Sequence, residues 1–444
     1  MSATSRQMHM GVFVLGTGNH SAGWRYEGAA TSHMQLPVMQ EIARIAERGK
    51  FDLLFISDSM VMEPTDHPSF MCRFEPTTLI TVLSASTTHI GLGATVSTSF
   101  SEPFNVARVF GSIDHISGGR AAWNVVTSSN SKAALNFNRD EHLEHELRYE
   151  RANEFVDVVR GLWDCWNDGA IVADKATGRY IDPDKVRVLH HKGRFFQVRG
   201  PLNMARCPQG HPVIIQAGGS PSGLELAART ADVVFSVVQE LEAAKVAYAD
   251  LKGRMAKYGR SPDDIAVLPG VMPIIGATDA EAREKLAKLQ SWLTPTNAAT
   301  LVASRIGYDV SGHPLDGPVP PPPRSEGSRT FAHVLYETAK REKMTLRDLY
   351  NLTAAARGHW VMCGTPQRIA DTLEEWFVGK AADGFNILPP YFPGAFADFV
   401  DLVVPELQRR GLFRLDYQGN TLRDHFNLAR VPAPTVRREA VGGA

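Results

Sequence analysis

Short apolar runs alternate along the chain with longer stretches in which apolar residues recur every three or four positions. The apolar runs are typical of parallel strands buried on both faces, and the periodic stretches predict amphipathic helices. Strands are expected at 9–15, 51–57, 89–97, 120–127, 213–217, 233–238, 265–275 and 385–388. Helices are expected at 36–49, 75–88, 103–116, 141–163, 222–230, 240–257, 279–292, 367–377 and 396–410.

This pattern of eight strand–helix units predicts an α/β fold of one kind, the (β/α)8 TIM barrel. Such a repeat closes most naturally into a cylinder, whose active site lies at the carboxyl ends of the strands. A doubly wound open sheet is the alternative. We therefore expect a single barrel domain over residues 1–415 and a C-terminal arm over residues 416–444.

Two long stretches do not fit the repeat and are expected to be insertions in the barrel. Residues of about 171–203 contain a hairpin-like pair of short segments around Lys192-Gly193. Residues of about 294–360 hold a proline-rich segment, 318–323, followed by helical stretches. A loop of that length in a compact domain is usually a lid or a binding element, so we expect it to cover the site. A surface excursion is the alternative.

The composition favours a small molecule as the partner. The 444 residues are 43% hydrophobic and 21% charged, with a net charge of −1, so charge favours neither nucleic acid nor a membrane surface. The four cysteines lack the paired spacing of a zinc site, and no apolar stretch approaches the ~20 residues of a membrane helix. The first residues lack the apolar core of a secretory signal, so a cytoplasmic location is expected.

The segment 212–223 is the most informative candidate site. An apolar strand ends in Gly218-Gly219, and Ser220-Pro221 then forms a favourable start for a helix. A strand that feeds through two glycines into a helix leaves free N–H groups at the positive end of the helix dipole, where a phosphate binds well. The alternative is an ordinary turn between a strand and a helix with a good cap.

Polar residues also follow the other strands. Asp58 closes the second strand, Thr95 lies near the end of the third, and Asn124 lies near the end of the fourth. In a barrel these positions converge on one mouth, and several in succession favour a site over isolated turn formers. His145 and Tyr149 are one turn apart on an expected helix, so both can donate to the same anion.

Two other kinds of site fit the sequence less well. Gly16-Thr-Gly18 follows the first strand as in a dinucleotide-binding fingerprint, but the third glycine and the acidic residue are not at the required places. His142 and His145 are expected one turn apart on a helix, a spacing that a metal can use. No third or fourth ligand accompanies them, so no metal is expected.

Several stretches in the first 235 residues resemble one family, the flavin-dependent monooxygenases of the bacterial luciferase superfamily. The resemblance is to the branch with nitrilotriacetate, EDTA and dibenzothiophene-sulfone monooxygenases and the pristinamycin synthase subunits. The matching stretches, in order, are His20-Ser-Ala-Gly-Trp-Arg25, Ala46-Glu-Arg-Gly-Lys-Phe-Asp52, Ile90-Gly-Leu-Gly93, Ser112-Ile-Asp-His-Ile-Ser-Gly-Gly-Arg120, Trp123-Asn-Val-Val-Thr-Ser128, Arg148-Tyr-Glu-Arg-Ala-Asn-Glu-Phe155, Gly200-Pro-Leu-Asn203, Pro208-Gln-Gly210 and Gln216-Ala-Gly-Gly-Ser220.

The resemblance implies a barrel that binds FMN at its C-terminal mouth. The implied flavin contacts are Asp58, Thr95, His145, Tyr149, Gly219 and Ser220. Ser220 and its neighbouring N–H groups are assigned to the phosphate, and His145 and Tyr149 to the phosphate or the ribityl chain. Asp58 and Thr95 are assigned to the isoalloxazine ring. His20, Trp24 and His313 are candidates for the substrate side, and no catalytic acid or base is identified.

The resemblance also implies the chemistry and the partners. Members of the family take reduced FMN from a separate NAD(P)H:flavin reductase, react it with O2 to a C4a-peroxyflavin and oxygenate a small organic substrate, such as a xenobiotic or a compound of sulfur or nitrogen. A homodimer or homotetramer is expected. The alternatives are a deazaflavin-dependent hydride-transfer enzyme, a flavin-binding protein without catalysis and, outside the flavoproteins, a metallohydrolase.

Overall fold

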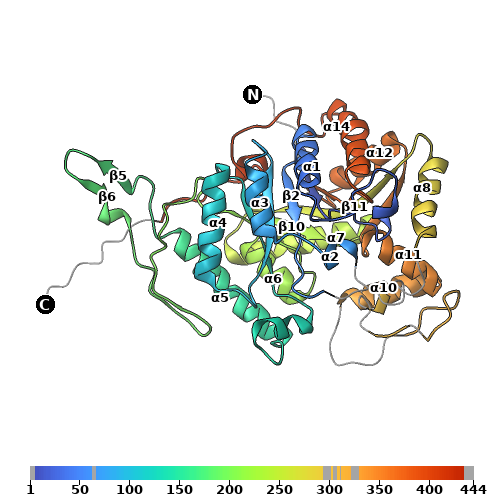
Figure 1. The fold of residues 1–444 in the computed structure, drawn as a ribbon, viewed down its shortest axis with the longest axis horizontal. Helices are drawn as coiled ribbons and strands as arrows, with labels where there is room; N and C mark the ends of the chain where they lie inside the picture. The colour runs from blue at the N-terminus through green and yellow to red at the C-terminus, as the bar shows by residue number, and fades with distance from the viewer. Residues whose placement is uncertain are drawn as a thin grey trace.

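Eight parallel strands close into a barrel in the computed structural model, which describes residues 6–62, 67–293, 302–303, 308–310, 312–321 and 330–434 (Figure 1). The pairings of β1 with β13 and of β10 with β11 close the ring, which excludes an open sheet and confirms the predicted TIM barrel. The barrel strands are β1 (His9–Phe13), β2 (Leu53–Ile56), β3 (Gly91–Ser97), β4 (Ala121–Val126), β9 (Val213–Gln216), β10 (Val233–Ser236), β11 (Ala266–Ile275) and β13 (Gly384–Ile387).

Alternation of side chains explains why these strands are apolar on both faces. Leu53 and Phe55 of β2 pack with the barrel interior, whereas Leu54 and Ile56 pack with the helix layer outside. All four residues are buried. The same alternation holds on β1, where Phe13 points inward and Val12 outward. Continuous apolar runs are therefore required by burial on both faces.

Helices surround the barrel, and most begin at a residue with a clear structural reason. Ser220, Thr278, Thr345 and Thr365 cap the helices that follow them, and proline occupies the first turn of α1, α3, α4, α6 and α12. The helices are α1 (Leu36–Arg48), α2 (Pro68–Met71), α3 (Pro76–Ser84), α4 (Pro103–Ser117), α5 (His145–Trp163), α6 (Pro221–Thr230), α7 (Leu241–Arg254), α8 (Asp279–Ser291), α10 (Thr330–Arg341), α11 (Leu346–Ala356), α12 (Pro366–Val378), α13 (Gly394–Asp398), α14 (Val404–Arg409) and α15 (Leu422–His425).

Short helical turns complete the picture: η1 (Gly23–Arg25), η2 (Ser131–Phe137), η3 (Pro183–Lys185), η4 (Met255–Tyr258), η5 (Pro262–Asp264) and η6 (Phe399–Val403). The π-helical η6 joins α13 to α14 just before Pro405, whose missing N–H interrupts the normal helical ladder. Among the described residues, no helix is both long and apolar enough to span a membrane.

A ninth strand, β12 (Trp360–Gly364), was not among the predicted elements. The lower part of β11, Ala266 to Pro269, pairs with β10, and its upper part, Val271 to Ile275, pairs with β12. The ten-residue β11 therefore extends beyond the barrel rim and holds the chain that returns from the insertion of residues 294–360. Within that insertion, residues 294–301, 304–307, 311 and 322–329 lie outside the described part of the chain, so the expected lid remains a prediction.

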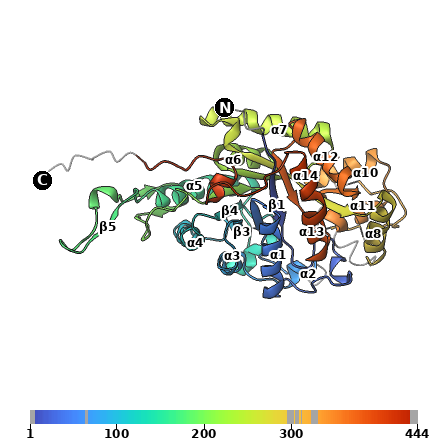
Figure 2. The same cartoon turned by 90° about the horizontal axis from the view of Figure 1, so that it is seen from above.

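The insertion of residues 171–203 consists of two antiparallel hairpins. One is formed by β5 (Ile171–Asp174) and β6 (Arg179–Ile181), and the other by β7 (His191–Lys192) and β8 (Gln197–Val198). Figures 1 and 2 both show the β5–β6 hairpin projecting from the barrel at the end opposite α8, α10 and α11. The hairpin lies away from the strand ends that carry the candidate site.

The chain after α14 packs against the N-terminal end of the barrel. Leu422 of α15 is fully buried, and it contacts the space beside Gly91 at the start of β3. Arg414 forms a buried ion pair with Asp52, which also accepts the backbone N–H of Met10 at 2.7 Å. Residues 414–428 therefore close the bottom of the barrel, opposite the mouth. The role of the arm in a subunit contact remains a prediction.

Candidate functional site at the barrel mouth

One side of the barrel mouth is aromatic. Phe13, Phe55 and Phe235 are inward-facing residues near the ends of β1, β2 and β10, and their ring centroids lie 5.2 to 6.0 Å apart. The imidazole of His359, just before β12, stacks on Phe235 with centroids 4.7 Å apart and planes 6° apart. These rings form a largely buried aromatic wall that keeps water away from this side of the mouth.

The neighbouring strands present polar side chains at the same rim. The Thr95 hydroxyl donates to the Ile56 carbonyl at 3.0 Å and accepts from the Asn124 amide at 2.9 Å. These bonds fix the Asn124 carboxamide, whose oxygen is buried and has no hydrogen-bond partner. A buried acceptor without a partner is costly in a folded protein unless a ligand satisfies it. The Asn124 oxygen therefore points to a ligand that carries a donor.

The turn between β9 and α6 has the form that the sequence predicts. The Ser220 hydroxyl accepts the N–H of Gly223 at 3.1 Å and caps α6. A Cβ atom on Gly218 would meet the Tyr149 hydroxyl at 2.9 Å and the Gln216 amide at 2.6 Å. Gly218 is therefore needed for the close approach of α5 to the turn, whereas the space around Gly219 is open. The first turn of α6 faces this open space.

The start of α5 lies beside the same turn. The rings of His145 and Tyr149 are 4.9 Å apart, as expected for residues one helical turn apart. Tyr149 is buried, and His145 is exposed at the helix start. Glu146 accepts two hydrogen bonds from the Ser222 hydroxyl, at 2.8 and 3.0 Å. The structure thus brings the predicted residues His145, Tyr149, Gly219 and Ser220 together in one group.

The predicted helical pairing of His142 with His145 is wrong. The helix begins at His145 after the extended Glu144, so His142 lies before it and not one turn away on its surface. His142 instead stacks on Phe100, and its Nε2 lies 2.6 Å from the Ser128 carbonyl. Over the described ranges, no group of three or more His, Cys, Asp and Glu side chains could hold a metal ion.

Asp58 lies two residues beyond β2, next to the Thr95 end of the rim. Its carboxylate accepts the N–H of Ser59 at 2.8 Å and lies 4.0 Å from the Arg73 guanidinium. Burial raises the pKa of Asp58, and the positive charge of Arg73 opposes that rise. Asp58 and Thr95 form a second group on the rim that continues, through Asn124 of β4, to strand β9 and its turn into α6.

The three substrate candidates have different environments. His20 is completely buried, its Nδ1 accepts the N–H of Ala22 at 3.1 Å, and its Nε2 has no hydrogen-bond partner. Trp24 is 42% exposed and His313 is also exposed. No contact within the described part of the chain brings Trp24 or His313 to the aromatic wall, so only His20 has a buried position near the mouth.

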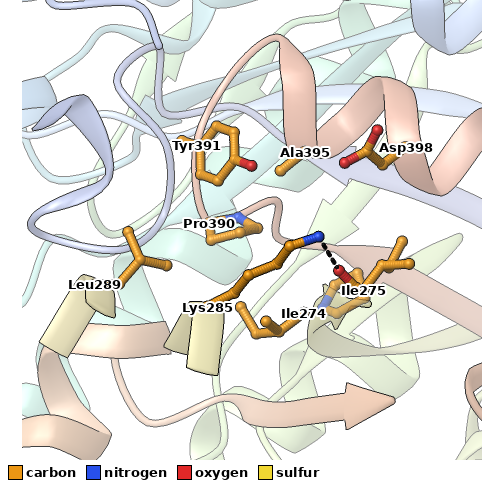
Figure 3. A pocket seen from close by; sticks show the side chains of 9 residues that line it. Ile274, Ile275, Lys285, Leu289, Pro390, Tyr391, Ala395 and Asp398 are labelled. Carbon is orange, nitrogen blue, oxygen red and sulfur yellow. Dashed lines mark hydrogen bonds between the residues drawn. The ribbon is translucent and has the colours of Figure 1, made fainter. Parts of the chain in front are cut away.

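A second hollow lies between α8, the end of β11 and the loop before α13 (Figure 3). It is lined mainly by apolar side chains, and Lys285 donates to the Ile275 carbonyl across its floor at 2.9 Å. Tyr391, at its edge, stacks on Tyr26 with centroids 4.0 Å apart. This hollow contains none of the predicted site residues and is separate from the barrel mouth.

Comparison with known proteins places the fold and the site in a family. The model of the luciferase-like monooxygenase family matches residues 8–383. The chain belongs to this family. It is 47% identical to N-acetyl-S-(2-succino)cysteine monooxygenase of Bacillus subtilis (strain 168), over 97% of this chain and 98% of that protein. It is 46% identical to nitrilotriacetate monooxygenase component A of Aminobacter aminovorans, over 96% and 97% of the two chains.

Solved structures of the family have the same fold. DmoA from Hyphomicrobium sulfonivorans superposes with a TM-score of 0.85 at 30% identity, over 95% of this chain and 92% of that one. EDTA monooxygenase from Chelativorans sp. BNC1 superposes with a TM-score of 0.79 at 32% identity, over 97% and 100%. The family members are monooxygenases of the two-component type, so the predicted resemblance and the enzyme class are both confirmed.

Sequence reasoning did not identify several polar residues that surround His20. His33, His67 and Arg73 lie in irregular links after β1 and β2, where no period exists to identify an inward direction. Arg357 directly follows α11, which belongs to the insertion. The aromatic wall did carry a signal, because Phe13, Phe55 and Phe235 each take a late inward position in a strand of period two.

Proposed function

We propose that the protein is the oxygenating component of a two-component, FMN-dependent monooxygenase. It takes reduced FMN from a separate NAD(P)H:flavin reductase and uses O2 to oxygenate a small organic substrate. The observation that carries the proposal is the turn between β9 and α6, where the capped helix start, the glycines and the Tyr149 hydroxyl surround an open space suited to a phosphate. A phosphate-bearing cofactor fits the residues that are present.

The residues of the rim divide the binding of FMN. Ser220, the first N–H groups of α6 and the His145–Tyr149 pair hold the phosphate and ribityl end. Asp58, Thr95 and Asn124 face the ring, and the unpartnered Asn124 oxygen accepts from a donor of the ligand. Bound FMN supplies the chemistry with oxygen. The aromatic wall of Phe13, Phe55 and Phe235 excludes water from the reacting atoms.

The names of relatives support the division into two components. One relative is a component A of its monooxygenase. Another, 43% identical, is one of two subunits of pristinamycin IIA synthase, and the other subunit of that synthase is 36% identical over 214 residues. We infer a similar division here, together with a cytoplasmic location and a homo-oligomeric state.

The purified protein tests this function directly. Reduced FMN titrated under anaerobic conditions should bind with saturation. With NADH, a flavin reductase and ¹⁸O2, one labelled oxygen atom should enter a substrate from a panel of organic acids, sulfones and thioethers. Turnover with NADH in the absence of any reductase would contradict the proposal. Activity with reduced deazaflavin in the absence of oxygen would select hydride transfer instead.

A further inference from the structure

A buried guanidinium lies on the side of the mouth next to Asp58. The Arg73 side chain is 8% exposed, and its Nη2 donates to the carbonyl of Ser57. Its Nε and Nη1 have no hydrogen-bond partner, because the Asp58 carboxylate at 4.0 Å is beyond hydrogen-bond distance. Burying charged donors without acceptors costs free energy, so this geometry favours an anionic ligand.

A second positive charge lies next to the first. The guanidinium carbons of Arg73 and Arg357 lie 5.2 and 4.6 Å from the centroid of the same ring, Phe70. Arg357 also lies 5.7 Å from the centroid of Phe13, in the aromatic wall. One partly buried carboxylate, Asp58, therefore faces two guanidinium groups at this place, which leaves a positive surplus at the edge of the mouth.

Neutral imidazoles add donors around the guanidinium groups. Nδ1 of His20 accepts the N–H of Ala22, and Nδ1 of His33 accepts the N–H of Gly16 at 2.9 Å. Burial lowers the pKa of both histidines to about 3, so each ring is neutral at pH 7 and carries its proton on Nε2. Both Nε2 atoms are buried without a hydrogen-bond partner.

Electrostatic coupling places these groups in one cluster. The charges of Arg357, His20 and Arg73 all lower the pKa of the buried His67, after the larger effect of burial. The pKa of His33 is lowered in the same way, first by burial and then by the charge of Arg73. We call Arg73, Arg357, His20 and His33 the donor cluster. It adjoins the aromatic wall through Arg357 and Phe13, and it lies on different elements from the turn between β9 and α6.

We propose that the donor cluster binds a carboxylate of the substrate, and that the substrate is therefore an organic anion with an apolar or thioether portion against the aromatic wall. The inference rests on the proposed function, since it assigns one end of the same mouth to FMN and the other to the substrate. Guanidinium and imidazole N–H groups bind carboxylates strongly in a site that excludes water.

The test compares acids with their uncharged amides. Nitrilotriacetate, succinate and benzoate, each beside its amide, are titrated calorimetrically into the full-length protein in the presence of oxidised FMN. At least one acid should bind, and its amide should bind at least tenfold more weakly. Arg73→Gln should then weaken binding of that acid by about tenfold to a hundredfold, as expected for a lost charged hydrogen bond.

Two further variants keep the test decisive. Arg357→Asn suits the left-handed backbone at this position, where φ is 55°, and it should also weaken binding of the acid. Arg347→Gln, an exposed arginine paired with Asp316, should leave binding unchanged. Equal binding of acids and amides, or acid binding unaffected by both mouth substitutions, overturns the carboxylate site. FMN binding is measured separately by flavin fluorescence, so its failure would contradict the proposed function and leave the comparison of acids with amides interpretable.

Discussion

The guanidinium of Arg423 donates to the carboxylate of Asp232 at 2.9 Å, and both side chains are less than one-tenth exposed. The other contacts of this pair tie it to the barrel. The same carboxylate oxygen accepts the N–H of Ile214 in β9 at 2.8 Å, and Arg423 also donates to the carbonyl of His211 at 3.1 Å. The pair therefore fastens the C-terminal segment to the starts of β9 and β10.

Removal of this arginine should destabilise the protein strongly. Arg423→Ala leaves the Asp232 carboxylate buried without its counter-charge, which costs about 3–5 kcal/mol for a broken buried pair. The free energy of unfolding in urea measures the loss. Arg430→Ala is the matched control, because Arg430 pairs with Asp168 at the surface, where ion pairs contribute about 0–1 kcal/mol. Similar losses in the two variants would contradict the buried role of Arg423.

Stability should fall as the pH drops below about 6.5, well before the carboxylates are protonated. Burial lowers the pKa values of His20, His33 and His67 to about 3, from an ordinary value of 6.5. Below pH 6.5 the unfolded state binds more protons than the folded state, so each histidine removes about 1.4 kcal/mol per pH unit until its folded-state pKa is reached.

Urea unfolding between pH 7 and 4.5 measures this slope. His33→Asn keeps an acceptor for the Gly16 N–H and removes one titrating ring, so the slope should decrease by about 1.4 kcal/mol per pH unit. A slope equal to that of the unchanged protein would show that His33 takes up its proton in the folded state.

A negative charge at the start of α6 should weaken FMN binding without unfolding the protein. Aspartate is a good N-cap, so Ser220→Asp preserves the helix start while it places a carboxylate beside the proposed phosphate site. We expect the dissociation constant for FMN to rise tenfold or more, measured by flavin fluorescence. Ser261→Asp, at the cap of η5, is the control and should leave FMN binding unchanged. Unchanged affinity in Ser220→Asp would refute the placement of the phosphate.

Glu146 should oppose FMN binding. Its carboxylate holds the Ser222 hydroxyl next to the first turn of α6, so it competes with a phosphate for that donor and repels its charge. Glu146→Gln should therefore tighten FMN binding about twofold to fivefold, with the larger gain at low salt. Glu150→Gln, one turn further along α5, is the control, and an equal gain there would indicate a general effect of surface charge.

The sequence predicts the barrel well because burial on two faces leaves an unmistakable apolar run in each strand. The turn from β9 into α6 is equally readable, since Ser220 caps the helix as its residue type and position require. β12 was missed because its residues, Trp360 to Gly364, follow an irregular insertion and pair only with the upper part of β11. Pairing between distant segments leaves no local period.

The donor cluster shows the same limit for the site. Arg73 and the neighbouring His67 are placed by links without periodic structure, and their burial depends on packing against Phe70 and the chain near His20. The sequence offers only isolated polar residues at these positions. By contrast, Thr95 lies in a strand whose inward and outward positions can be counted, so its place on the rim follows from the pattern.

The extra length of β11 separates two tasks within one enzyme. Residues after β2 to β9 surround the turn into α6, while Arg357 and His359 arrive on a return path fixed to β11 by five paired positions. Changes in the excursion that ends at this path can alter what the enzyme recognises without disturbing the cradle on the opposite strands. A family built in this way can acquire new substrates while its cofactor chemistry stays constant.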